Sequence, residues 1–153
     1  MLGKSCFFIG HRDAPETIAA QLEEAIERHI TEYGVNAFVV GNYGGFDQMV
    51  QKALADAKNR HPDILIRMAV AYSPARVLVE LPDGFENIYF PMEQRKTPGR
   101  AAIPHLNRIL VNESNFLIAC VNRTSGGAYS VLEYARRREK RGLIRVMTLQ
   151  ENG

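Results

Sequence analysis

Four short segments, each following an apolar run, carry residues suited to binding an anion: three contain glycine, and three contain arginine or histidine. They are GHRD, GNYGGFDQ, YSPAR and NRTSGGAYS, which begin at Gly10, Gly41, Tyr72 and Asn122. Glycine has no Cβ and permits positive φ, so its backbone N–H can approach an anion closely. A helix that starts directly after such a loop adds unpaired N–H groups and the positive end of its dipole. For any one loop a tight turn is the plainer explanation, but the two glycine loops GNYGGFDQ and SGGAYS together with GHR predict a shared anion-binding site.

The elements that must position these loops alternate along the chain. Short apolar runs predict strands over residues 6–10, 36–41, 64–72, 115–121 and 143–149. Helical spacing of apolar residues predicts helices over residues 14–34, 45–61, 101–114 and 127–142. Strands and helices in this order build a parallel sheet with right-handed crossovers. We therefore expect one Rossmann-like α/β domain over residues 1–153, with a mostly parallel sheet of about five strands and helices on both faces.

The segment over residues 73–100 is the least regular part of the sequence. It carries four prolines, two glycines and many polar side chains, and a loop of this length in a compact domain is usually functional or mobile. Its aromatic stretch ENIYFPM, residues 86–92, has two open interpretations, a lid over the site and an oligomer contact.

Composition places the chain among ordinary soluble globular proteins. It has 153 residues, 46% hydrophobic and 24% charged, and a formal net charge of +2, which is too small to indicate nucleic acid. Cys6 and Cys120 lie inside apolar runs, so we expect buried free thiols, with a disulfide as the alternative. The start of the chain does not resemble a signal peptide, and no apolar run approaches membrane-spanning length. We expect a cytoplasmic protein with no membrane partner, no metal and no cofactor.

Ligands of open parallel sheets bind beyond the carboxyl ends of the strands, where loops and helix N-termini meet. Arg12 would donate a guanidinium fork to a phosphate, or else pair with Asp13 on the surface. Asp47 has two interpretations of equal weight, a helix-capping acid and a ribose ligand. The ligand-binding residues expected from the three glycine-containing loops are Gly10, His11, Arg12, Gly41, Asn42, Gly44, Gly45, Asp47, Ser125, Gly126, Gly127, Ala128 and Ser130.

Four stretches in this order and spacing resemble the SLOG superfamily, which joins the DprA-type and LOG-type Rossmann-like domains. They are FFIGHRD, VVGNYGGFDQMV, LNRILVNESNFLIACV and SGGAYSVLEYA. The nearest branch is that of the YpsA-like bacterial proteins, which begin with a strand followed by Gly-His-Arg. The resemblance covers nearly the whole chain, with only a loose match over residues 76–100. It implies a nucleotide-like ligand, a homodimer and, from the asparagine often found in YpsA-like sequences, a place for Asn107 near the site.

LOG enzymes release a free base from a nucleoside 5′-monophosphate, and their signature is Pro-Gly-Gly-x-Gly-Thr-x-x-Glu. By this resemblance, Gly126 and Gly127 match the glycine pair, and Glu133 falls at the place of the signature glutamate. Ser125 and Tyr129 stand where the signature has proline and its third glycine. Leu106 stands where LOG enzymes have an arginine, and Arg108 lies roughly 200° further around the helix.

Three functions follow from these observations. We expect a sensor or regulatory domain that binds a nucleotide or a nucleotide-derived molecule. The first alternative is a LOG-like phosphoribohydrolase, a hydrolase of an N-glycosidic bond, in which Glu133 stabilises the ribosyl cation. In the alternative interpretation, Glu133 has no role in a site and only stabilises its helix, because a negative charge near the N-terminus interacts favourably with the helix dipole. The distant alternative is a DprA-like DNA-binding module that uses Arg136, Arg137 and Arg138. Because consecutive arginines fan around a helix, a solvated surface is the expected interpretation.

Overall fold

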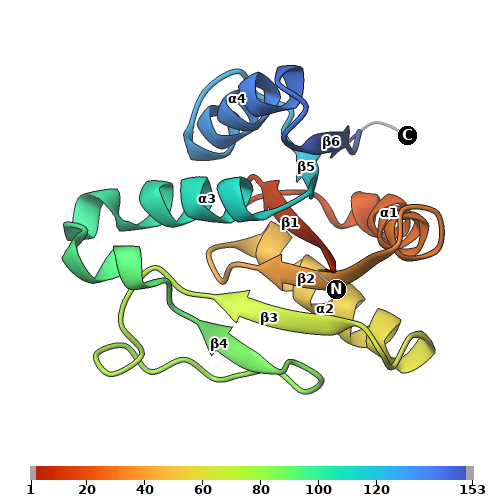
Figure 1. Cartoon of the computed structure of the whole chain (residues 1–153), viewed down its shortest axis with the longest axis horizontal. Coiled ribbons are helices and arrows are strands. Elements are labelled where there is room, and N and C mark those ends of the chain that lie inside the picture. The colour runs from red at the N-terminus through yellow and green to blue at the C-terminus, as the bar shows by residue number, and fades with distance from the viewer. Residues whose placement is uncertain (1–2, 151–153) are drawn as a thin grey trace.

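Apolar runs of the sequence form the strands of a single sheet in the computed structural model, which describes residues 3–150. All neighbouring strands are parallel, and their order is β4-β3-β2-β1-β5-β6 (Figure 1). The strands are β1 (Lys4–Gly10), β2 (Val35–Val40), β3 (Leu65–Ala69), β4 (Asn87–Tyr89), β5 (Phe116–Cys120) and β6 (Arg145–Thr148).

Helices cover both faces of this sheet, which is why its central strands are apolar throughout. On β1, Cys6 and Phe8 face one core cluster, and Phe7 and Ile9 face the other. The first cluster is packed by α1 (Ala19–Thr31) and α2 (Gly45–Arg60), and the second by α3 (Ala102–Glu113) and α4 (Gly127–Lys140). The predicted Rossmann-like α/β class is confirmed.

The sheet has six strands, one more than the roughly five expected from the sequence. The additional strand, β4, lies inside the segment expected to be irregular, together with the 3-10 turns η2 (Met92–Lys96) and η3 (Gly99–Ala101). Only three residues long, β4 has one neighbour, and none of its residues is fully buried. A short edge strand of this kind has no alternating apolar pattern, so it depends on pairing with β3 rather than on local sequence.

Both cysteines are free thiols in the core, as expected from their apolar surroundings. Burial raises the pKa of the Cys6 thiol, which keeps it protonated and unreactive. None of the helices in the described part of the chain combines the length and apolar character that crossing a bilayer requires.

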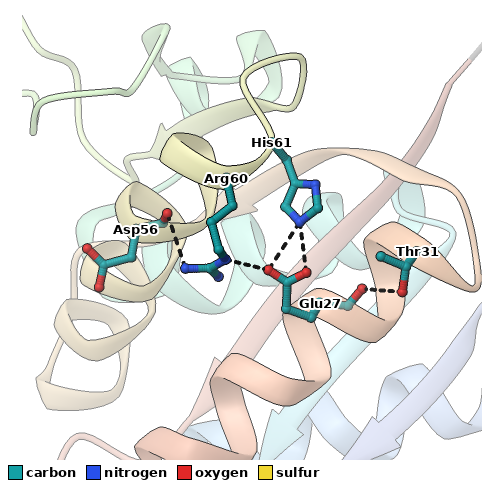
Figure 2. A network of polar contacts seen from close by, with 5 residues as sticks. All are labelled: Glu27, Thr31, Asp56, Arg60 and His61. Atoms are coloured by element: carbon teal, nitrogen blue, oxygen red, sulfur yellow. Dashed lines mark hydrogen bonds and ion pairs between the residues drawn. The ribbon is translucent and has the colours of Figure 1, made fainter.

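A polar network joins α1 to the carboxyl end of α2 (Figure 2). Glu27 accepts hydrogen bonds from Arg60 Nε at 2.7 Å and contacts His61 Nε2 at 2.7 Å. Arg60 also donates to the backbone carbonyl of Asp56. Partial burial opposes ionisation of Glu27, but the bonds from Arg60 and His61 outweigh it and lower its pKa.

Replacing Glu27 by glutamine should lower the free energy of unfolding by about 1 kcal/mol near neutral pH, since a partly exposed network is worth little more. A lowered folded-state pKa stabilises the protein above the unfolded pKa, and this contribution is lost as pH falls through the folded pKa. The deficit of Glu27→Gln should therefore shrink below about pH 4.5 in urea unfolding. Glu32→Gln, which breaks a more exposed pair with Arg28, is the control and should change stability by less. An equal loss in both variants would contradict the prediction.

Candidate ligand-binding site

The sheet reverses its strand order beside β1, and this reversal creates the candidate site. The chain builds β2, β3 and β4 on one side of β1, then crosses to place β5 and β6 on the other side. The loops that leave β1 and β5 therefore diverge to opposite faces and open a crevice outside the carboxyl ends of the strands.

A cleft of about 650 Å³ occupies this position. Ten of the residues expected to bind a ligand line it: Gly10, His11, Arg12, Gly41, Asp47, Asn107, Ser125, Gly126, Gly127 and Ala128. Seven further residues complete the lining: Phe7, Phe8, Ile9, Asp13, Tyr43, Ile103 and Arg123. The structure thus brings together the β1, β2 and β5 loops with one side of α3.

The first glycine pair, Gly44 and Gly45, packs against the loop after β1. The N–H of Gly45 donates to the carbonyl of Arg12 at 2.8 Å. A Cβ on Gly44 would lie 2.8 Å from Arg12 Cα, and one on Gly45 would lie 2.6 Å from Arg12 O. Gly44 also has a φ of +130°, which side chains rarely adopt. This pair is therefore required for loop packing, and it does not line the cleft.

The second glycine pair, Gly126 and Gly127, is open to the cleft. A Cβ on either residue would meet no atom within 4 Å. Gly126 is the N-cap of α4, with a φ of +92° and no side-chain cap. The first N–H groups of the fourteen-residue helix α4 have no intrahelical acceptors, so their partial positive charge is directed at the cleft.

Two arginines, Arg12 and Arg123, line the cleft, and only Arg123 forms an ion pair within residues 3–150. Arg123 donates to Asp13 at 2.9 and 3.3 Å, which ties the β5 loop to the β1 loop. The hydrogen bond from Arg123 lowers the pKa of Asp13. Arg12, the side chain expected to pair with Asp13 if it did not bind a ligand, forms no ion pair within residues 3–150. Its exposed guanidinium stays available to an anion.

Asp47 is the interior acid of the cleft. It accepts the Tyr43 N–H at 2.8 Å, and a Cβ on Gly41 would lie 2.9 Å from its Oδ2 atom. Burial raises its pKa to about 6, while the Tyr43 hydrogen bond and the positive charge of Arg12 offset only part of that effect. Asp47 therefore stabilises the turn before α2 and also presents a carboxyl to the cleft.

Five predicted residues lie outside the cleft lining: Asn42, Gly44, Gly45, Ser130 and Glu133. The Glu133 carboxylate lies near the Tyr129 hydroxyl, one helical turn earlier, and its charge raises the pKa of that phenol. Ser130 is exposed on α4, and Asn42 accepts a hydrogen bond from Gln51.

Sequence reasoning missed three polar members of the lining, Asp13, Tyr43 and Arg123. All three lie within segments already singled out for their glycines, so extending the prediction to the whole of each loop would have included them. Ile103 also reaches the cleft, from α3. Among residues 3–150, no group of three His, Cys, Asp or Glu side chains could hold a metal ion.

No protein-family model matches the chain, and no curated protein is significantly similar to it. The geometry of the cleft is accordingly the basis for the function proposed below.

A glycine whose Cβ position is occupied by a neighbouring side chain should tolerate alanine less well than a glycine that faces open space. In Gly10→Ala the new Cβ would lie within 3.0 Å of three atoms of the Phe46 ring, so we expect a loss of about 1–3 kcal/mol in unfolding free energy. In Gly127→Ala the new methyl group enters open space, so stability should change by less than about 0.5 kcal/mol. Chemical unfolding of both variants measures the difference. Comparable losses would mean that Gly127 is needed for packing.

Asp47→Asn should stabilise the protein at high pH. The raised folded-state pKa means that the contribution of Asp47 is complete below the ordinary value of 3.8 and is lost as pH rises through about 6. Asparagine retains an oxygen for the Tyr43 N–H and carries no charge. The stability of Asp47→Asn relative to wild type should thus rise by about 2 kcal/mol between pH 4.5 and pH 8 in urea unfolding. The control is Asp56→Asn on the exposed side of α2; a flat profile for Asp47→Asn would contradict the assignment.

Proposed function

We propose that the cleft binds a nucleotide or a nucleotide-derived small molecule, and that the protein is a sensor or regulatory domain of the superfamily it resembles. One observation carries the proposal. The cleft at the strand-order reversal combines the open N-terminus of α4 at Gly126 and Gly127 with the unpaired guanidinium of Arg12. Backbone N–H groups without side-chain obstruction and an arginine fork are the donors that phosphate oxygens prefer.

The remaining lining suits the other parts of a nucleotide. Asp47 and Asn107 offer acceptors and an amide donor for ribose hydroxyls, and the partly buried Ile103 and Tyr43 offer an apolar wall for a base. Arg123, held by Asp13, adds positive charge at the edge of the β5 loop. The ligand class follows from this donor set rather than from the fold, because Rossmann-like domains serve many functions.

The phosphoribohydrolase alternative depends on a carboxylate beneath the sugar. Glu133, the residue expected for that role, is directed toward Tyr129 and does not line the cleft; the acids that do are Asp13 and Asp47. Binding without turnover is accordingly the proposed function. The DNA-binding alternative rests on Arg136, Arg137 and Arg138 of α4, and Arg137 packs over the Tyr134 ring.

Adenosine 5′-monophosphate should stabilise the wild-type protein in a thermal-shift titration. A ligand at 100 times its Kd adds roughly 2.7 kcal/mol, which corresponds to roughly 5–10 °C in a domain of this size. Gly127→Asp should abolish the shift because it places a negative charge at the N–H groups of α4. Arg12→Gln should weaken binding about tenfold or more, the usual effect of losing a hydrogen bond to a charged group.

Two matched variants serve as controls for that titration. Gly127→Asn has nearly the size of Gly127→Asp without its charge and should retain more affinity, while Arg136→Gln removes an arginine outside the cleft and should bind normally. Chromatography of the same mixtures should detect no free adenine. Release of adenine that persists in Glu133→Ala but disappears in Asp47→Asn would establish hydrolysis by the cleft acid instead. Absence of any shift with mononucleotides, ADP-ribose or cyclic dinucleotides would contradict the proposal.

A further inference from the structure

A second cavity lies beyond the carboxyl ends of β3 and β4, in the segment whose fold could not be predicted. Its volume is about 610 Å³. The residues that line it come from the β3 end, the loop that follows, the β4 end and the two 3-10 turns: Ala71, Tyr72, Ser73, Arg76, Val77, Phe90, Gln94, Arg95, Thr97 and Gly99. None of these residues lines the first cleft.

Positive charge in this cavity is not balanced by any acid. Arg76 and Arg95 both line it, and its lining contains neither aspartate nor glutamate. Neither arginine takes part in an ion pair within the described residues 3–150. Exposed arginines scattered over a surface need no ligand, but two unpaired guanidinium groups that share one concave space attract an anion.

Two aromatic rings accompany the arginines. Tyr72 follows β3 and Phe90 follows β4, and because these strands are parallel neighbours, both rings lie at the same edge of the sheet. Tyr72 is 36% exposed, although large aromatic side chains are normally well covered. Its ring packs edge-to-face against Tyr43 of the first cleft, with centroids 6.4 Å apart, so the two cavities meet at a tyrosine pair.

Gln94 makes the base of this cavity rigid. Its side chain is 3% exposed, and Nε2 donates to the carbonyls of Ala71 and Ala102 at 3.1 and 2.8 Å. Its Oε1 atom contacts His105 Nδ1, and the same nitrogen lies 2.9 Å from Thr97 Oγ1. These contacts tie the β3 end, η2 and α3 together. The cavity is therefore formed by a buried hydrogen-bonded network rather than by a gap between unattached loops.

From these observations we propose that the second cavity is a binding site for a planar aromatic anion, a nucleobase or aryl ring that carries a phosphate. The ring would stack on Tyr72 and Phe90, and the phosphate would take hydrogen bonds from Arg76 and Arg95. The Ser73 hydroxyl, which accepts a hydrogen bond from the Ala75 N–H, keeps its own proton and is a further donor. This site is independent of the ligand proposed for the first cleft.

Amide chemical shifts distinguish the two sites directly. Adenosine 5′-monophosphate and phenyl phosphate are titrated into 15N-labelled protein in the Gly127→Asp background, which disables the first cleft. Both ligands should shift the amides of Tyr72, Ser73 and Thr97. Inorganic phosphate and adenosine, each of which supplies only half of the ligand, should bind at least tenfold more weakly. Shifts confined to residues 126–128 in the wild type, with none at Tyr72, would overturn the second site while leaving the first intact.

Matched arginine variants test the contacts. The double variant Arg76→Gln/Arg95→Gln should lose affinity at the second site at least tenfold. The control double variant Arg100→Gln/Arg136→Gln removes the same charge from exposed positions outside both cavities and should keep it. Equal affinities of the two double variants would overturn the proposal, and so would inorganic phosphate that binds as tightly as the aromatic ligands. If a variant fails to fold, the affinities of the wild-type protein, measured at the Tyr72 amide, still test the proposal. Adenosine 5′-monophosphate and phenyl phosphate should then bind more tightly than inorganic phosphate and adenosine.

Discussion

The close contact between the loop after β1 and the start of α2 is the constraint on which the candidate site depends. The Gly45 N–H bonds the Arg12 carbonyl at 2.8 Å, and Gly44 leaves no room for a side chain at that point. This contact fixes the path of the chain directly after the central strand. It leaves the Arg12 side chain facing the crevice beside β5 while its backbone is held by α2. The Arg123–Asp13 ion pair then ties the same loop to the β5 loop, which leads into α4.

The two glycine pairs therefore have different physical roles although they look alike in sequence. Gly44 and Gly45 remove side chains so that one backbone can pack on another. Gly126 and Gly127 have no neighbour where a Cβ would lie, so their missing side chains leave space in front of the α4 N–H groups. Such open backbone N–H groups at a helix start are well suited to binding an anion.

The two cavities also differ in electrostatics, although both lie at the carboxyl edge of the sheet. The first is mixed, because Asp13 pairs with Arg123 and Asp47 lies inside, near Arg12. The second has two arginines and no acid. A lining with both acids and arginines suits a ligand that carries anionic groups as well as hydroxyls. A cationic lining beside aromatic rings suits an anion attached to an aromatic ring. The Tyr43–Tyr72 contact is their common boundary.

The sequence by itself determined the α/β class, the four long helices and the five longer strands, because each of these helices carries an apolar period and each of these strands lies in a short apolar run. It also indicated which loops converge, since the carboxyl ends of parallel strands meet at one edge. Tertiary structure decided the rest. The strand β4 forms only because β3 offers it a partner, and a three-residue edge segment has no periodic pattern to reveal it. Whether a glycine serves packing or leaves open space depends on what lies opposite it in the fold. The sequence does not reveal whether that neighbour is Phe46, Arg12 or empty space. Likewise, Asp13 pairs with Arg123 rather than with adjacent Arg12 because folding, not sequence proximity, places the two charges together.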